Sequence, residues 1–177
     1  MDLAPQTTLA LAGQEVDDAY NSIVPPLYQS AIFRFEDVGE TKGYDYTRSG
    51  NPTRAALEDT LSDLDGGAGA VACATGMAAV STVTALFDAD AHLICAHDCC
   101  GGTERLFSHL DAQGKLSVSY EDLSDCDALA DAVRPETTAL WVETPSNPLL
   151  RIVDLEALSE FADAHDLLLI VDNTFLS

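Results

Sequence analysis

Short apolar runs alternate with amphipathic stretches along the chain after residue 68. The apolar runs predict strands at 69–73, 92–96, 116–120, 138–143 and 167–172. Apolar residues at helical spacing predict helices near 76–87, 103–112, 126–133 and 154–165. Strands that alternate with helices are joined by right-handed crossovers, which favours a mostly parallel sheet with helices on both faces. The pattern therefore predicts the α/β fold class.

A longer helix is predicted ahead of this alternation. Asn51 can cap it and Pro52 suits its first position, while Gly66 is placed to end it. Apolar residues recur between them at helical spacing: Leu57, Leu61 and Leu64. The residues before Asn51 show little periodicity. We therefore predict an extended N-terminal arm with local turns over 1–50, followed by one domain over 51–177.

The chain stops soon after its last predicted strand. The run at 167–172 predicts a buried strand, yet only residues 173–177 come after it, with no helix to cover that part of the sheet. Because an α/β domain covers both faces of its sheet, we expect a truncated domain whose C-terminal part is missing.

Charge is the unusual feature of the composition. Among 177 residues, 8 Lys and Arg stand against 30 Asp and Glu, a formal net charge of −22. This balance argues against binding to nucleic acid or to anionic membranes. No apolar run approaches the roughly 20 residues that a bilayer requires, and the N-terminus lacks the positive charge of a signal peptide. We therefore expect a soluble, cytoplasmic protein.

The five cysteines are an odd number without a CxxC pair, which argues against a disulfide framework. One cluster could place three side chains on a strand face as zinc ligands: Cys95, His97, Cys99 and Cys100. No second ligand pair occurs nearby, so reduced structural thiols are favoured over a metal site.

Polar residues come after several predicted strands, at the edge where open parallel sheets bind ligands. Gly76 and Met77 begin a helix whose free N–H groups could hold an anion, although a plain packing turn is the alternative. Glu143 and Asn147 belong to a polar loop made rigid by two prolines. Asp172 ends the last strand, where its alternative role is that of a helix cap or turn former.

The arm carries one more candidate. Tyr46 and Arg48 are two residues apart, so on an extended chain their side chains project the same way and could bind a phosphate together. A surface turn is the alternative. No GxxxxGK[ST] or GxGxxG motif comes after a strand, so nucleotide binding finds no support.

Five ordered segments resemble the Cys/Met-metabolism family of fold-type-I pyridoxal-phosphate (PLP) enzymes. They are DYTRSGNPTR at 45–54, ATGMAA at 74–79, AHDCCGGT at 96–103, ETPSNPLLRIVD at 143–154 and VDNTFLS at 171–177. The resemblance extends from about Val24 to Ser177. Within the family, the segments ATGMAA, HDC, RLF and NPLLRIVD are most similar to cystathionine γ-synthases. The resemblance implies the N-terminal portion of the large, PLP-binding domain of that fold.

The resemblance also implies how a phosphate would be held. The backbone N–H groups of Gly76 and Met77 would bind the phosphate of PLP. Tyr46 and Arg48 would reach the phosphate in a neighbouring subunit, which makes a homodimer or homotetramer part of the site.

Around the cofactor ring, the resemblance implies that Asp172 keeps the pyridine nitrogen protonated. Asn147 would bind the ring hydroxyl or the substrate carboxylate, and Thr174 would pack near the ring. Glu143 is implied as a supporting residue. Cys100 is a departure, because the family has a tyrosine there that stacks on the ring, and a thiol cannot stack.

A second departure concerns the lysine that binds PLP as a Schiff base. The family carries it in an S-x-T-K segment beyond VDNTF, and neither Lys42 nor Lys115 lies in such a motif. The implied catalytic lysine therefore lies beyond Ser177, and so does the domain that binds the substrate carboxylate.

The reaction implied by the resemblance is γ-replacement, in which an O-acylhomoserine and cysteine give cystathionine and the free acid. Two alternatives on the same scaffold are cystathionine γ-lyase and O-acetylhomoserine sulfhydrylase. A third alternative is an inactive fragment or pseudo-enzyme, which the missing lysine and Cys100 both favour.

The dispersed acidic residues suggest a halophilic protein, because molar salt shortens the Debye length to about 3 Å and screens their repulsion. We expect the melting temperature to rise as KCl is increased from dilute to molar concentration. Full structure and stability in dilute buffer, monitored by circular dichroism, would contradict this hypothesis.

Overall fold

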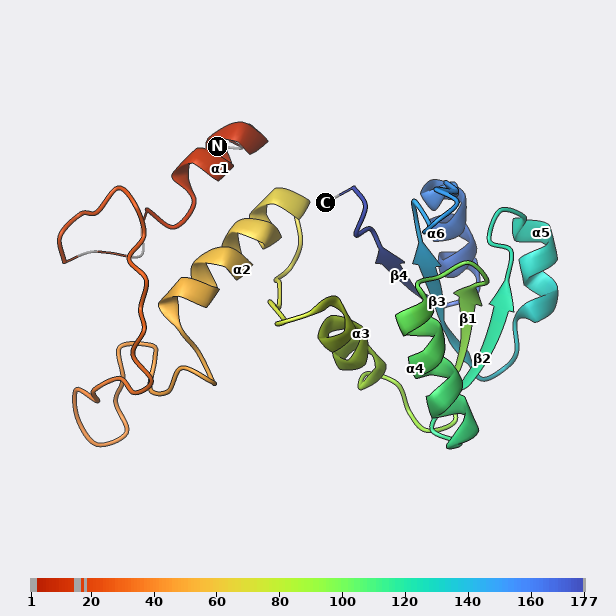
Figure 1. Cartoon of the computed structure of the whole chain (residues 1–177), viewed down its shortest axis with the longest axis horizontal. Coiled ribbons are helices and arrows are strands. Elements are labelled where there is room, and N and C mark those ends of the chain that lie inside the picture. The colour runs from red at the N-terminus through yellow and green to blue at the C-terminus, as the bar shows by residue number, and fades with distance from the viewer. Residues whose placement is uncertain (1–2, 15–16, 18, 177) are drawn as a thin grey trace. The chain divides into compact units, whose positions relative to one another are not determined.

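The computed structural model describes residues 3–14, 17 and 19–176, with the side chain of Asp127 left out. Residues 1–2, 15–16 and 18 of the predicted arm, and Ser177 of the predicted domain, lie outside the described residues. The chain divides into two compact units, 1–73 and 74–177 (Figure 1). The boundary predicted after residue 50 relied on the change in periodicity and stays a prediction.

The first unit contains the predicted helix as α2 (Pro52–Asp65). The side chain of Asn51 accepts a hydrogen bond from the Thr53 N–H at 2.8 Å, and Pro52 occupies the first turn. Gly66 ends the helix in the left-handed region with φ of 62°, which glycine adopts without strain. The structure thus confirms the predicted helix and the residues that begin and end it.

The arm also contains a short helix, α1 (Pro5–Leu11), that the sequence did not predict. Pro5 stands at its start, but Ala4 at the cap position offers no side-chain hydrogen bond. A helix of 7 residues gives periodicity too little length to detect. Elsewhere the arm makes local turns and an isolated antiparallel bridge between Ile32 and Tyr46.

The strand predicted at 69–73 is wrong. These residues form neither a helix nor a strand, and the side chain of Val71 is 76% exposed. The N–H of Ala72 donates to Oε1 of Glu58 at 2.9 Å, where a strand would use a neighbouring backbone. An apolar, β-prone run shows only that a segment suits a sheet, and a strand also needs a partner to bond.

The second unit is built on a four-stranded parallel sheet with the order β2-β1-β3-β4. The strands are β1 (His92–Ala96), β2 (Ser117–Glu121), β3 (Thr137–Glu143) and β4 (Leu168–Asp172). All lie within a residue of their predicted positions. The parallel sheet and the α/β class are thereby confirmed.

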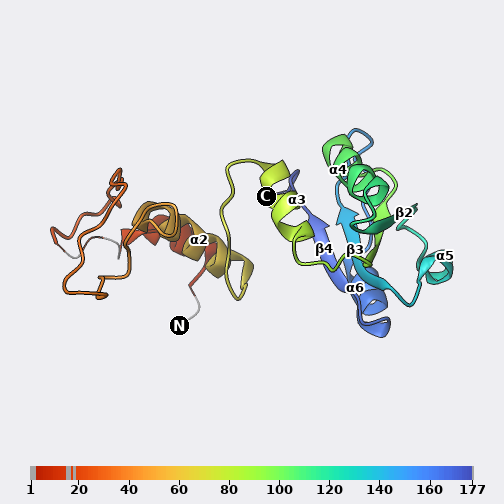
Figure 2. The ribbon, with the colours of Figure 1, turned by 90° about the horizontal axis from the view of Figure 1, so that it is seen from below.

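The helices of this unit cover both faces of the sheet (Figure 2). They are α3 (Gly76–Thr84), α4 (Gly101–Ala112), the short α5 (Cys126–Leu129) with the 3₁₀ turn η2 (Ala130–Ala132), and α6 (Leu155–Ala164). The predicted helix at 126–133 is thus shorter and partly 3₁₀, and the predicted 76–87 helix ends at Thr84.

Alternation along the strands gives each face its own core. Leu93 of β1 packs with Phe107 of α4 and Trp141 of β3 on the α3/α4 face. The Phe107 and Trp141 rings meet edge to face, with centroids 5.0 Å apart. Ile94 packs with Phe161 on the α5/α6 face. Consecutive residues of a strand therefore contribute to the cores on opposite faces of the sheet, as expected for a parallel sheet that is covered on both sides.

Strand β4 is less buried than its apolar sequence predicts. Leu168 is 49% exposed and Val171 is 36% exposed, whereas every residue of β1 is buried. The strand order explains this difference, because β1 is flanked on both sides and β4 has β3 on one side only among the described residues. Hydrophobicity predicts a strand but not its place in the sheet order.

A buried histidine connects three strands at the amino edge of the sheet. His92 is fully buried, with Nδ1 2.8 Å from Oγ1 of Thr137 on β3 and Nε2 3.0 Å from Oγ of Ser119 on β2. Arg134 bonds to both hydroxyls, through its backbone N–H and its guanidinium. Burial, reinforced by the positive charge of Arg134, lowers the pKa of His92 below its usual 6.5.

This lowered pKa predicts an acid-sensitive fold. Below about pH 6.5 the unfolded chain binds a proton on His92 more readily than the folded chain does. The free energy of unfolding should therefore decrease as the pH is lowered through this window. His92→Gln removes that proton uptake. We expect urea midpoints of the wild-type protein to fall more steeply than those of the variant between pH 6.5 and 5. Equal pH slopes would contradict the assignment, and the comparison cancels the common effect of the many carboxylates.

Candidate functional site

The carboxyl ends of the strands bring the predicted site residues of the second unit to one edge of the sheet. Glu143 ends β3 and Asp172 ends β4, and the two are paired in register. Cys100 lies just after β1, at the N-terminus of α4. We call this side of the sheet, with its loops, the carboxyl edge.

The N-termini of α3 and α4 meet at the carboxyl edge. A Cβ atom built on Gly102 would lie 2.7 Å from Sδ of Met77 and 3.7 Å from Sγ of Cys100. Glycine at position 102 therefore permits the close approach of the Met77 side chain to α4. The structure thus brings Met77 of α3 and Cys100 together, although β1 lies between them in the sequence.

The N-terminus of α3 presents backbone N–H groups. Oγ1 of Thr75 caps the helix by accepting the Ala78 N–H at 3.1 Å. Gly76 is exposed, and a Cβ there would meet no atom within 4 Å. The first N–H groups of a helix have no partners within it and carry a partial positive charge, so this terminus suits an anion such as a phosphate.

Glu143 is a buried carboxylate, with 6% of its surface exposed. Its Oε2 accepts the backbone N–H of Cys100. Burial raises the pKa of Glu143, the Cys100 hydrogen bond opposes this shift, and the nearby Asp172 charge adds to it. The side chain of Asn147 is exposed.

Asp172 is held by the turn after β4. Its Oδ1 accepts the backbone N–H of Thr174 at 3.1 Å and the Thr174 hydroxyl as well. Its own carbonyl accepts the Thr144 N–H at 3.1 Å, so the backbone of the β3 loop is bonded to the end of β4. Asp172 is therefore a partly buried carboxylate in a defined orientation.

Tyr46 and Arg48 belong to the first unit and are both exposed. The Arg48 guanidinium lies over the Tyr46 ring, 5.0 Å from its centroid, so the two side chains do project to the same side. Whether they bind a phosphate stays a prediction.

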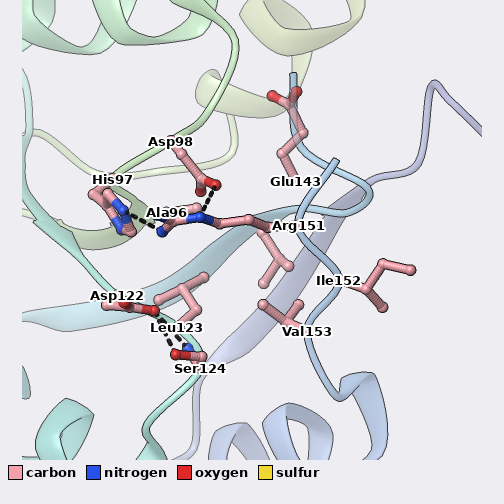
Figure 3. Close-up of a pocket in the computed structure, with 11 residues that line it drawn as sticks. Ala96, His97, Asp98, Asp122, Leu123, Ser124, Glu143, Arg151, Ile152 and Val153 are labelled. Atoms are coloured by element: carbon pink, nitrogen blue, oxygen red, sulfur yellow. Dashed lines mark hydrogen bonds and ion pairs between the residues drawn. The ribbon is translucent and has the colours of Figure 1, made fainter. Parts of the chain in front are cut away.

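A pocket of about 320 Å³ opens at the carboxyl edge, and Figure 3 shows its lining. Arg151 reaches across it, with Nη1 donating to Nε2 of His97 at 3.0 Å and Nε 4.0 Å from Oδ2 of Asp98. The Ser146 hydroxyl donates to the same Oδ2 at 2.6 Å. Of the predicted site residues in the described part of this unit, Glu143 lines the pocket.

The hydrogen bonds of His97 define its tautomer. Nδ1 lies 3.1 Å from the Glu121 carbonyl oxygen, which can only accept, so Nδ1 carries the proton. Nε2 is then the acceptor for Arg151. His97 and Asp98 thus bind Arg151 from the loop after β1, and together they hold the loop after β3. Sequence reasoning did not single out Asp98, Ser146 or Arg151 as site residues, although Arg151 lies within the recognised NPLLRIVD segment.

The two lysines of the chain have other places in the fold. Lys115 precedes β2 and therefore lies at the amino edge, opposite to Asp172. Lys42, in the first unit, pairs with Glu36 at 3.4 Å on the surface. In the part of the chain that the structure describes, no three His, Cys, Asp or Glu side chains are grouped as metal ligands. No helix among those residues is long and apolar enough to cross a membrane.

Comparison with known proteins agrees with this arrangement. The family model for the Cys/Met metabolism PLP-dependent enzyme matches residues 6–177. This chain belongs to that family. A solved cystathionine γ-synthase from Xanthomonas oryzae pv. oryzae, in complex with cystathionine, superposes on the whole chain with a TM-score of 0.95 and 42% identity, over 46% of its own chain. The chain is therefore similar to the N-terminal portion of this family's proteins.

Curated relatives of different activity match almost equally well. The cystathionine γ-synthase/O-acetylhomoserine (thiol)-lyase of Bacillus subtilis is 42% identical over 96% of this chain and 46% of its own length. The cystathionine γ-lyase of Sus scrofa is 42% identical over 94% of this chain and 42% of its own. The chain thus spans less than half the length of these relatives, and its similarity to them does not separate synthase from lyase.

The contact between the helix N-termini can be tested with Gly102→Ala. The new Cβ would displace Met77, which we expect to offset the gain of up to about 1 kcal/mol from the better helix propensity of alanine. In a Met77→Ala background the gain should reappear as a higher free energy of unfolding. Gly101→Ala, one residue earlier, would meet only the flexible Arg105 side chain and serves as control. Additive effects of Gly102→Ala and Met77→Ala on urea unfolding would contradict the contact.

Proposed function

We propose that the full-length gene product is a PLP-dependent enzyme of sulfur amino-acid metabolism that catalyses γ-replacement, forming cystathionine from an O-acylhomoserine and cysteine. The observation that carries the proposal is the meeting of a helix N-terminus, an oriented carboxylate and two bonded loops at one edge of a sheet of this family. Similarity to a cystathionine γ-synthase structure over the whole chain supports the choice of reaction.

The donor set of the carboxyl edge fits PLP. The backbone of Gly76 and Met77, at the N-terminus of α3, suits the phosphate dianion, and the open space in front of Gly76 leaves these N–H groups accessible. Asp172 supplies a carboxylate of the kind that pairs with a protonated pyridine nitrogen. Tyr46 and Arg48 would complete the phosphate site of a neighbouring subunit in a homodimer or homotetramer.

Each residue then has a chemical task. When bound, PLP supplies an electron sink for the negative charge that develops on a substrate amino acid. Asp172 would hold a proton at the pyridine nitrogen, and Thr174 orients this carboxylate through two hydrogen bonds. Asn147 would donate a hydrogen bond to the ring hydroxyl or to the substrate carboxylate. Cys100 would leave the ring without the aromatic stacking that the family's tyrosine supplies, a contribution of about 1 kcal/mol.

A second candidate is cystathionine γ-lyase activity, which the equal identity to the Sus scrofa enzyme favours. The two reactions differ after the γ-substituent has left the substrate. A synthase admits the cysteine thiol to the substrate, and a lyase completes the cycle with water. Residues that choose between thiol and water must contact the substrate.

The reaction can be tested on the purified full-length gene product with PLP, O-succinylhomoserine and cysteine. We expect cystathionine as the product. Ammonia and a keto acid without cystathionine would establish the lyase instead. Asp172→Asn should keep PLP bound but lower kcat by about 100-fold, because the neutral amide no longer stabilises the ring proton.

Asp163→Asn removes one exposed charge from α6 and is the matched control, which should retain activity. Titration of each variant with PLP, monitored by visible absorbance, separates lost cofactor from lost turnover. An Asp172→Asn variant with unchanged kcat would exclude the proposed role of this carboxylate.

A further inference from the structure

Glu143 combines high burial with negative charge. Carboxylates are rarely buried without a cation, because the ionised form loses its hydration when it leaves water. Its Oε2 accepts the backbone N–H of Cys100, and the charges that act on its pKa come from two further carboxylates, Asp172 and Asp98. A side chain that served only to fill this position would be more stable without a charge.

The role of the charge is visible in its hydrogen bond. The N–H group that donates to Oε2 of Glu143 belongs to Cys100, in the loop after β1. A carboxylate oxygen is charged and only accepts, so it makes a stronger hydrogen bond with this donor than a neutral amide oxygen would. Glu143 thereby bonds to the loop after β1 from the end of β3.

Asp98 makes the reverse connection, from the loop after β1 to the loop after β3. It accepts from Ser146 and pairs with Arg151, both in the loop after β3. Figure 3 shows Asp98 and Arg151 facing each other, while the Glu143 side chain points away from them. Glu143 thus connects the end of β3 to the loop after β1, and Asp98 connects that loop to the loop after β3.

We propose that Glu143 is a positioning residue that holds Cys100, at the N-terminus of α4, in the arrangement that receives PLP, an inference that rests on the proposed function. The two loops carry predicted ring neighbours, and the Asp172 paired with Glu143 in register is the predicted partner of the pyridine nitrogen. Glu143 acts through these neighbours and through the order of their backbone.

The raised pKa of Glu143 agrees with this role. A carboxyl group whose pKa is raised by folding destabilises the fold above its usual pKa of 4.5, where the unfolded chain ionises more readily. At neutral pH the charge therefore lowers the free energy of unfolding while it orders the loop after β1. Functional sites often contain groups that lower the stability of the fold and are retained because activity requires them.

The test compares Glu143→Ala and Glu143→Gln in the full-length gene product. Without PLP, we expect the Cys100 amide to exchange with solvent about ten-fold faster or more in the alanine variant, because it loses a charged acceptor. The Kd for PLP should rise by about the same factor. The glutamine variant keeps one acceptor, so both effects should be smaller, and its melting temperature should not fall below that of the wild type.

Asp163→Ala is the control, because it removes an exposed carboxylate near the C-terminal end of α6, beyond the turn that follows the β3 loop. Unchanged exchange at Cys100 in both Glu143 variants would overturn the proposal, as would faster exchange with unchanged affinity for PLP. A lower melting temperature with faster exchange throughout the sheet would assign Glu143 a structural role instead. If the alanine variant does not fold, the glutamine variant decides by the same two measurements.

A wild-type protein that does not bind PLP would refute the proposed function and with it the role of Glu143 toward the cofactor. The exchange of the Cys100 amide would still report on its hydrogen bond to Glu143. The two failures are therefore distinguishable, because exchange is measured without PLP and affinity is measured with it.

Discussion

The parallel direction of the four strands is the constraint on which the site depends. Because every strand runs the same way, the segments after β1, β3 and β4 emerge at one edge, and α4 begins there as well. The register of β3 and β4 then places Glu143 beside Asp172. No separate scaffold is needed to bring these residues together, and ligand sites of open parallel sheets are found at this edge for the same reason.

The carboxyl edge concentrates negative charge in a chain that is already strongly acidic. Asp98, Glu143 and Asp172 lie at this edge, and each receives hydrogen bonds from backbone or hydroxyl donors. These donors make the carboxylates tolerable, because a buried charge needs hydrogen bonds to replace water. The N-terminus of α3 provides the opposite polarity. An anionic group would be drawn to the helix terminus and a protonated ring nitrogen to Asp172.

Local signals predicted most of the fold. The Asn51 cap, Pro52 and Gly66 placed α2, and strand and helix periodicity placed the sheet, because these features act over a few neighbouring residues. The prediction of a strand at residues 69–73 failed, because strand formation depends on pairing with a neighbouring strand. The apolar character of these residues says nothing about whether such a partner is present. The reaction also stays a proposal, because the chain covers less than half of relatives with different activities.

The sequence by itself determined the α/β class, the family and the candidate residues Gly76, Asn147 and Asp172, because periodicity and motifs are properties of consecutive positions. Only the tertiary structure decided that β4 lies at the side of β3, that Met77 contacts α4, and that Glu143 bonds to the loop of Cys100. These are contacts between distant segments. They arise from strand order and register, which no local pattern specifies, and they turn separate motifs into one edge of a sheet.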